Sequence, residues 1–323
     1  MQGRSGERQR NPWEEDPWEK EYPFEYFKYE VDKNEKIATV TLNNPEGGDA
    51  APFWYVYPGI RLIDRWERDD DVKVVIIKSA GKNFCTGHTL GGYLEHAGKR
   101  SVSRKEAAGK KIRPTNRQLI FGMRDAFEFH TRLLCSLKPT IAQVHGMSVA
   151  AGWHIQNECD MTIASDDAHF GEIGQVAGVS GILGTPHWGK MPIGRKLFRE
   201  AAATGRTFSA NQAAAMGIIN RVVPRKKLNE EVWNEARRIA MVPIDGLVTG
   251  KYGAMLTLYQ SGAIYPDITP FAGHSIKFED DEFHFFNIAR EKGVGEAVRQ
   301  RKELYAPLGG YGVAAEADRV IED

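Results

Sequence analysis

The sequence has few cysteines, and the three present, Cys85, Cys135 and Cys159, show neither a CxxC motif nor a metal-ligand spacing. An odd number of cysteines argues against the disulfide framework of a secreted domain. The nine histidines are also scattered without the spacing of metal ligands. We therefore expect no metal site and a reducing, cytoplasmic environment.

Long apolar runs and an excess of one charge are lacking as well. No run approaches the roughly 20 apolar residues of a membrane span, and the opening MQGRSGERQR lacks the apolar segment of a signal peptide. Lys plus Arg equals Asp plus Glu, at 43 each. No global field therefore favours nucleic acid or an anionic membrane as a partner, and we expect a soluble protein.

Two repeated patterns of apolar residues define the fold class. The runs IATVTLNN and VKVVIIKS are rich in β-branched residues, and the helix-like WYVYPGIRLIDRWERDDD separates them. The runs PTIAQVHG and MTIAS repeat this arrangement around a small-residue segment. Strand, helix, strand in this order predicts parallel strand pairs, so the chain is expected to be α/β.

Composition divides the chain into three expected parts. Residues 1–23 form an acidic and aromatic N-terminal extension, which we expect to dock onto the protein's own fold or a sister subunit. Residues 24–225 form the core. Residues 226–323 form a C-terminal helical region, with one helix at NEEVWNEARRIA and a further helical stretch at DDEFHFFNIAREKGVGEAVRQRKEL.

A basic window between the repeated units has two interpretations. It can be a solvated loop, as charged loops commonly are, or a clamp for phosphate groups. Nucleic-acid binding through it is a weaker alternative, since no other feature supports it. Its eight cations are Lys99, Arg100, Arg104, Lys105, Lys110, Lys111, Arg113 and Arg117.

Two strand ends run into turns made of very small residues. The segments IIKSAGKNFCTGHTL and IAQVHGMSVAAGWH each pass from a β-branched strand into glycine or alanine. Such turns can aim backbone NH groups at one point, and two convergent NH groups stabilise an oxyanion. Either turn alone can equally reflect tight packing of a helix against a sheet. The pair is more specific than either one.

The sequence resembles the crotonase (enoyl-CoA hydratase/isomerase) superfamily over roughly residues 24–224. Five ordered segments carry the resemblance: TLNNPE at 41–46, VKVVIIKSAGKNFCTG at 72–87, KPTIAQVHGMSVAAGWH at 138–154, CDMTIASDDAHFGE at 159–172 and TGRTFSANQAAAMGIINRVVP at 204–224.

The resemblance implies a spiral of ββα units with a C-terminal helical region that forms trimers, so we expect a homotrimer or a dimer of trimers. It also implies a coenzyme A thioester as substrate, with no covalently bound cofactor. Carried over by position, the NH groups of His88 and Ala151 form the oxyanion hole. Thr89, Tyr93 and His145 lie close to it in sequence and are candidate substrate contacts.

The sequence departs from hydratases of this family at the positions of both catalytic glutamates. The first falls on His154 and the second on Gly174. His154 can still act as a base, or can be a histidine that is only packed and hydrogen-bonded. Glu172 can supply a carboxylate or lie on a solvated loop. Because His154 matches a catalytic position of the family, the catalytic interpretation of this histidine is favoured.

Two further segments bear on the substrate. FGEIGQVAGVSG resembles ring-forming and ring-opening relatives that also carry glycine at position 174, although their aspartate is replaced by Gly181. On the adenine side, Asp49 and Ala50 stand where many relatives have Asn and Ala. We count Asp49, Ala50 and Gly174 as candidate substrate contacts.

The sequence thus favours an acyl-CoA enzyme in which water is the second reactant. Hydration of a bulky or cyclic enoyl-CoA ranks first, with His154 as base and Glu172 as its partner. Hydrolytic C–C cleavage of a cyclic ketoacyl-CoA or β-diketone is the alternative. A crotonase-fold binding protein without catalysis is the alternative from another class.

Overall fold

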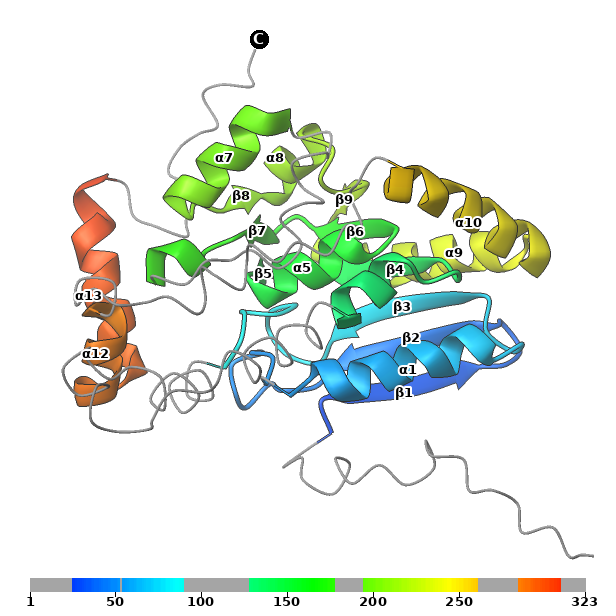
Figure 1. Cartoon of the computed structure of the whole chain (residues 1–323), viewed down its shortest axis with the longest axis horizontal. Helices are drawn as coiled ribbons and strands as arrows, with labels where there is room; N and C mark the ends of the chain where they lie inside the picture. Colours follow the sequence, from blue (N-terminus) through cyan, green and yellow to red (C-terminus); the bar gives the residue numbers. More distant parts are fainter. Residues whose placement is uncertain (1–24, 53, 90–127, 178–193, 261–283, 309–323) are drawn as a thin grey trace, which may run out of the picture.

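The computed structural model describes all of the chain except residues 1–24, 53, 90–127, 178–193, 261–283 and 309–323. The N-terminal extension, the basic window, Tyr93 and Gly181 lie outside the described residues. A six-stranded sheet forms the centre of the described part, as Figure 1 shows. Its strands are β1 (Phe27–Asp32), β2 (Ile37–Leu42), β3 (Val74–Ser79), β4 (Thr140–Val144), β6 (Met161–Ser165) and β9 (Arg221–Val223).

The two parallel pairs predicted from the sequence are confirmed. β2 pairs with β3 in parallel, with Ile37 opposite Val74, and β4 pairs with β6 in parallel, with Ile141 opposite Met161. β3 and β4 are also parallel neighbours, which joins the two units into one sheet. The edge strand β1, which the sequence analysis did not separate from the N-terminal segment, is antiparallel to β2.

A second, three-stranded sheet lies beside the first. β5 (Met147–Val149) pairs in parallel with β7 (His169–Gly171), and β7 pairs antiparallel with β8 (Phe208–Ser209). β5 leads directly into the short helix α5 (Ala151–Glu158), and β7 leads to the 3-10 turn η2 (Gly174–Ala177). These two strand ends are the ones that carry the candidate site.

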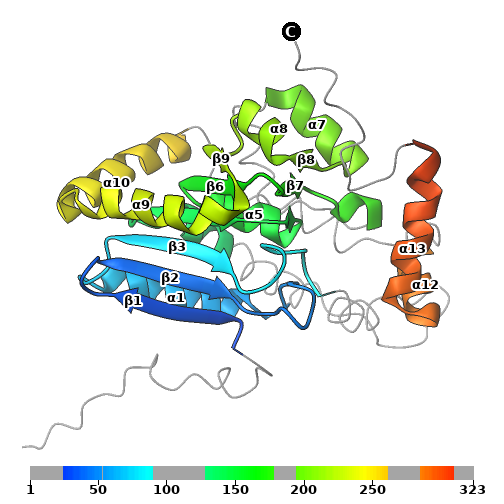
Figure 2. The ribbon, with the colours of Figure 1, turned by 180° about the vertical axis from the view of Figure 1, so that it is seen from behind.

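Helices cover both faces of the larger sheet because its strands are apolar on both faces. On one face α1 (Val56–Arg68) places Ile63 and Trp66 against the side of β3 that carries Val75 and Ile77. On the other face Val232 of α9 (Leu228–Ala240) packs in the cluster that contains the alternate residues of β3. Figure 2 shows α9 crossing the sheet on the face opposite α1.

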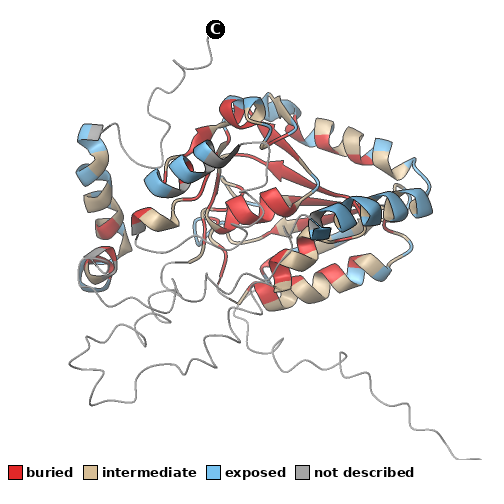
Figure 3. Cartoon of the chain, turned by 45° about the horizontal axis from the view of Figure 1, so that its top comes forward, coloured by how far each residue is buried: buried red, intermediate tan, exposed pale blue. Residues whose placement is uncertain are grey.

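The remaining helices lie toward the outside. α8 (Ala210–Ala215) begins with a capping box, in which Ser209 and Gln212 exchange hydrogen bonds between side chain and backbone. The others are α7 (Gly194–Thr204), the 3-10 turn η3 (Arg225–Lys227), α10 (Ile244–Gln260), α12 (His284–Lys292), α13 (Val294–Tyr305) and the 3-10 turn η5 (Ala306–Leu308). Buried residues concentrate in the sheets and in the helices between them, as Figure 3 shows.

The C-terminal helical region differs in detail from the expectation. The stretch expected to be helical up to Leu304 contains two helices, because Gly293 between α12 and α13 has φ of +88°. This left-handed conformation favours glycine and cannot continue an α-helix. Across the part of the chain that the structure describes, no helix has the length and apolar character needed to cross a membrane.

Candidate active site

The two small-residue turns lie against each other. Cys85 donates its NH to the carbonyl of Met147 at 3.0 Å and accepts from the NH of Val149 at 3.0 Å. Gly87, with φ of +100°, lies so close to the other turn that a Cβ on it would sit 3.0 Å from the Cβ of Ala150. The two turns expected to meet are therefore neighbours in the fold, and convergence of their NH groups on one point stays a prediction.

Backbone geometry sets the direction of both candidate oxyanion donors. The carbonyl of Gly87 accepts from the NH of Ala51 at 2.7 Å. Because the C=O and N–H of a trans peptide point in opposite directions, the NH of His88 points away from Ala51. In the same way, the carbonyl of Ala150 accepts from the NH of His154 at 3.0 Å, so the NH of Ala151 points out of the N-terminus of α5.

Ala150 sits at the junction in a rarely adopted backbone conformation. Its φ is +50° and its ψ is −115°, a region that L-residues normally avoid. Its NH donates to the carbonyl of Gly171 at 3.0 Å, which ties the turn to the end of β7. Strained backbone of this kind is found preferentially at functional sites.

His154 and Glu172, the predicted catalytic pair, are brought together. His154 lies in the first turn of α5 and Glu172 directly follows β7, and their side chains are 4% and 2% exposed. His154 Nε2 is 2.9 Å from Glu172 Oε2. The two atoms are in close contact without the geometry of a hydrogen bond, since Glu172 Oε2 has no hydrogen-bond donor of correct geometry among the described residues.

The backbone at the second glutamate position holds the carboxylate of Glu172. The NH of Gly174 donates to Glu172 Oε1 at 2.7 Å. One oxygen of the carboxylate is thus fixed by the backbone while the other faces His154. Glu172 is therefore a buried residue of the site and does not lie on a solvated loop.

A second buried histidine and carboxylate stand beside the first pair. His130, from the helical segment 128–134, places Nδ1 2.6 Å from Oε2 of Glu158 on α5. The hydroxyl of Tyr55, the residue that precedes α1, is 2.9 Å from His130 Nε2. The rings of His130 and His154 meet edge to face with centroids 5.6 Å apart.

This chain of three residues also reaches the other half of the site. The Tyr55 ring lies 5.6 Å from the ring of His88, measured between centroids. Burial, together with the negative charge of Glu158, raises the pKa of the Tyr55 phenol well above its usual value, so the hydroxyl keeps its hydrogen. The sequence analysis missed all three residues. The one available signal was the spacing of four between His154 and Glu158 on one helix face.

The other candidate contacts have identifiable structural partners. Asp49, with φ of +62°, is buried and accepts from the backbone and side-chain NH groups of Asn83 at 2.8 and 3.2 Å. His145 Nε2 is 3.0 Å from the carbonyl oxygen of Gly81. Asp49 and His145 thus brace the turn that leads to His88. A direct contact of either with substrate stays a prediction.

Thr89 and Ala50 line the same region through their backbones. The NH of Thr89 donates to the carbonyl of Ala51 at 2.8 Å, and the carbonyl of Ala50 accepts from the side chain of Asn44 at 2.7 Å. Both residues are half-buried. Their role as substrate contacts also stays a prediction.

Burial makes Cys85 a packing residue of this site. The side chain is fully buried between the two turns, and its pKa is raised to about 11 by burial. A thiol with this pKa is protonated near neutral pH and is a poor nucleophile. Among the described residues, no cluster of three or more His, Cys, Asp or Glu side chains is arranged to hold a metal ion.

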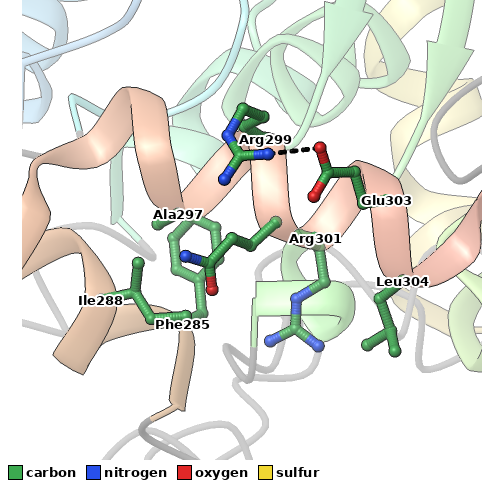
Figure 4. A pocket seen from close by; sticks show the side chains of 8 residues that line it. Phe285, Ile288, Ala297, Arg299, Arg301, Glu303 and Leu304 are labelled. Carbon is green, nitrogen blue, oxygen red and sulfur yellow. Dashed lines mark hydrogen bonds and ion pairs between the residues drawn. The ribbon is translucent and has the colours of Figure 1, made fainter.

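A cavity of about 390 Å³ lies elsewhere, between α12 and α13. Figure 4 shows its lining: Phe285, Ile288 and Ala297 on one side, with Arg299, Arg301, Glu303 and Leu304 around them. Arg299 pairs with Glu303 and with Glu296, so the charges at this cavity largely neutralise one another. None of the candidate site residues lines it.

Comparison with known proteins identifies the family. The enoyl-CoA hydratase/isomerase family model matches residues 32–258. The chain is 32% identical over 250 residues to the Mycobacterium tuberculosis protein named "Putative enoyl-CoA hydratase EchA13", covering 74% of this chain and 73% of that protein.

Solved structures agree with this match. An enoyl-CoA hydratase/isomerase from Xanthobacter autotrophicus Py2 superposes with a TM-score of 0.75 at 26% identity, covering 87% of this chain and 98% of that one. An enoyl-CoA hydratase from Mycobacterium smegmatis superposes with a TM-score of 0.74 at 26% identity, covering 89% and 96%. The crotonase fold expected from the sequence is confirmed, and the chain belongs to the enoyl-CoA hydratase/isomerase family.

Proposed function

We propose that this protein hydrates a bulky or cyclic enoyl-CoA, with His154 as general base, Glu172 as its partner and the NH groups of His88 and Ala151 as the oxyanion hole. The observation that carries the proposal is the buried contact of His154 with Glu172 at the start of the helix that also presents Ala151. Burying an imidazole and a carboxylate costs free energy unless the two groups satisfy each other fully. Buried titratable pairs of this kind occur preferentially at functional sites.

The pair suits water activation because the carboxylate directs the imidazole. A carboxylate 2.9 Å from Nε2 favours the tautomer with its hydrogen on Nε2, which leaves the lone pair of Nδ1 to accept a proton. A neutral imidazole of this kind is an effective base near neutral pH.

The proposed reaction proceeds through an enolate. His154 takes a proton from water, and the oxygen of that water forms a bond to the β-carbon of the enoyl thioester. The electron pair of the double bond moves onto the thioester oxygen, where the two NH groups stabilise it. His154 then gives the proton that it took from water to the α-carbon, and the thioester carbonyl forms again. One such NH donor contributes on the order of 3 kcal/mol to transition-state stabilisation.

Histidine at position 154 and glycine at position 174 replace the glutamate pair in this proposal. The hydratase mechanism with two glutamates is therefore not the one proposed. The backbone of Gly174 instead holds Glu172, which supports a shift of the carboxylate by two positions along the chain.

Hydrolytic C–C cleavage of a cyclic ketoacyl-CoA or β-diketone is the second candidate. The same activated water would form a bond to the carbonyl carbon of a ring ketone, and the neighbouring C–C bond would break. Its electron pair would move onto the carbonyl oxygen held by the two NH groups, and the carbon released would then take up the proton that His154 removed from water. The base paired with a single buried carboxylate suits this attack as well as hydration. A non-catalytic binding protein is the third candidate, and the contact between His154 and Glu172 weighs against it.

Mass spectrometry in oxygen-18 water separates the three candidates. The protein is incubated with linear enoyl-CoA, cyclic enoyl-CoA and cyclic ketoacyl-CoA thioesters. Gain of one labelled water with an intact ring supports hydration, and a labelled, opened ring supports cleavage. His154→Ala serves as the control and should abolish either signal. Absence of turnover with the whole panel would favour the binding protein.

Assembly, compartment and coenzyme A recognition complete the proposal. We propose a homotrimer or dimer of trimers in the cytoplasm, formed through the C-terminal helices, with coenzyme A phosphates bound by some of the cations in 99–117. Light scattering on the purified protein tests the assembly. A tenfold rise in KM on replacing those cations, with kcat unchanged, would support the phosphate role.

A further inference from the structure

The linked side chains of Tyr55, His130 and Glu158 have no role in the mechanism above. They are nevertheless buried beside the proposed base, His154. The three side chains come from the start of α1, the segment 128–134 and the end of α5, and they are 0%, 2% and 3% exposed. A buried carboxylate, imidazole and phenol in one line are expensive to desolvate. Such a cluster therefore needs an explanation beyond packing.

The polarity of this chain follows from its contacts. The phenol keeps its hydrogen, and its one hydrogen-bond partner within the described ranges is Nε2 of His130. If the hydroxyl donates to Nε2, then Nδ1 carries the ring hydrogen and donates to Glu158 Oε2 at 2.6 Å. The chain then reads Tyr55 to His130 to Glu158, and each donor has an acceptor. In this arrangement the His130 ring is held in one tautomer and one orientation.

A ring fixed in this way limits how His154 can move. The edge-to-face contact with His130 bounds one part of the His154 ring, and Glu172 lies 2.9 Å from its Nε2. His154 and Glu158 also belong to the same helix, α5, so one rigid element carries both the proposed base and one member of the three-residue chain. Aromatic edge-to-face contacts have a preferred geometry and so transmit orientation from one ring to the next.

The same chain contacts the oxyanion side of the site. The Tyr55 ring packs against the ring of His88, whose NH is one of the two proposed donors. Tyr55 directly precedes α1 and comes four residues after Ala51. The NH of Ala51 donates a hydrogen bond to the carbonyl of Gly87. One buried unit thus contacts both the base and the turn that presents the oxyanion donor.

We infer that Tyr55, His130 and Glu158 are positioning residues, which together hold His154 and the His88 turn at the mutual distance that catalysis requires. This inference rests on the proposed function, because it assigns the three residues to the same site. It adds a second, non-reacting histidine and carboxylate behind the reacting pair. Turnover should depend on these three residues, while substrate binding should not.

Removal of single hydroxyl groups tests the role with little change in shape. Tyr55→Phe should lower kcat about tenfold, the effect of losing one orienting hydrogen bond, and should leave KM within about twofold. The pH dependence of kcat should shift with it, since the environment of the base changes. Tyr29→Phe is the matched control, because the Tyr29 hydroxyl is buried without a hydrogen-bond partner within the described residues. It should leave kcat and its pH profile unchanged.

Conservative replacement separates orientation from simple packing. Glu158→Gln keeps an oxygen that can accept the Nδ1 hydrogen of His130, whereas Glu158→Leu removes it. We expect Glu158→Gln to retain several times the turnover of Glu158→Leu. Equal losses in two folded variants would contradict an orienting role for the acceptor.

A readout that needs no substrate keeps this inference separate from the proposed function. The full chain is labelled with 13C at the histidine Cε1 positions, and the signals of His130 and His154 are assigned from His130→Gln and His154→Gln. In Tyr55→Phe the His154 signal should move together with that of His130. A moved His130 signal with an unmoved His154 signal would overturn the inference, even if every thioester were turned over. If no thioester is turned over, the proposed function fails while the His154 signal still decides this one.

Discussion

The close approach of the two turns at Gly152 leads to a quantitative prediction. A Cβ added at this residue would lie 2.4 Å from the carbonyl oxygen of Cys85 and 2.8 Å from its Cβ. Neither atom is the far end of a flexible side chain, and ordinary contacts begin near 3.4 Å. Gly152→Ala therefore requires the start of α5 and the turn after β3 to separate by about 1 Å, because a packed interior has little free space.

The expected cost falls mainly on catalysis. A misplacement of about 1 Å at reacting groups lowers the rate by roughly 100-fold, and loss of one oxyanion donor costs on the order of 3 kcal/mol. Forcing one extra methyl group into a packed core costs about 1–3 kcal/mol of the free energy of unfolding. We therefore expect Gly152→Ala to fold, with a kcat/KM about 100-fold below that of the natural protein.

The assay follows the absorbance of the enoyl thioester that the labelled-water experiment identifies, and urea denaturation reports the free energy of unfolding. Gly250→Ala is the matched control, since nothing lies within 4 Å of its added Cβ and the residue is on the exposed helix α10. It should keep full activity and gain up to about 1 kcal/mol of stability from helix propensity. Natural-level turnover in a folded Gly152→Ala protein would refute the argument that the separation of the turns sets the rate.

Further predictions concern the catalytic pair and the titrating groups. His154→Ala should reduce kcat about 1,000-fold with little effect on KM, which single-turnover kinetics would show. Glu172→Gln should reduce kcat about tenfold or more, since it keeps the shape of the carboxylate but not its charge, and a rate equal to that of the natural protein would remove its role. Burial raises the pKa of Tyr29 to about 12, so the folded state keeps this proton while the unfolded chain loses it near pH 10. Its contribution to stability is complete below pH 10 and is lost as the pH rises toward 12, which urea melts of Tyr29→Phe and the natural protein across this range would detect. With a pKa of about 11 and full burial, Cys85 should resist alkylation at pH 8 until the chain unfolds, and rapid labelling of the native protein would contradict its placement.

Local pattern in the sequence was enough to predict the central strands and the two turns. β-branched runs separated by a helical pattern have one common solution, a parallel pair, and β2 with β3 and β4 with β6 adopt it. Small residues at Gly87 and Gly152 are needed where two backbones approach, and this requirement is visible in the sequence itself. The pairing of His154 with Glu172 was expected from the family resemblance, and the two side chains approach to 2.9 Å.

Features that depend on distant parts of the chain could not be predicted in this way. Tyr55 and His130 are 75 residues apart, and no local pattern links them. Asp49 was expected near the substrate, but its contacts with Asn83 depend on how two loops meet in space. The break at Gly293 is a local feature, yet glycine is also tolerated inside helices, so the sequence alone did not distinguish the two cases.

The complete burial of α5 has a consequence for how this scaffold can acquire new reactions. All eight residues of the helix are buried, so it has no solvent face on which changes are free. A new chemistry cannot come from moving the helix, because every side would have to repack at once. It can come from exchanging single side chains at positions that already point to the substrate. Laboratory evolution of this protein should therefore sample position 154 together with its partner at 172, with the rest of the helix kept constant.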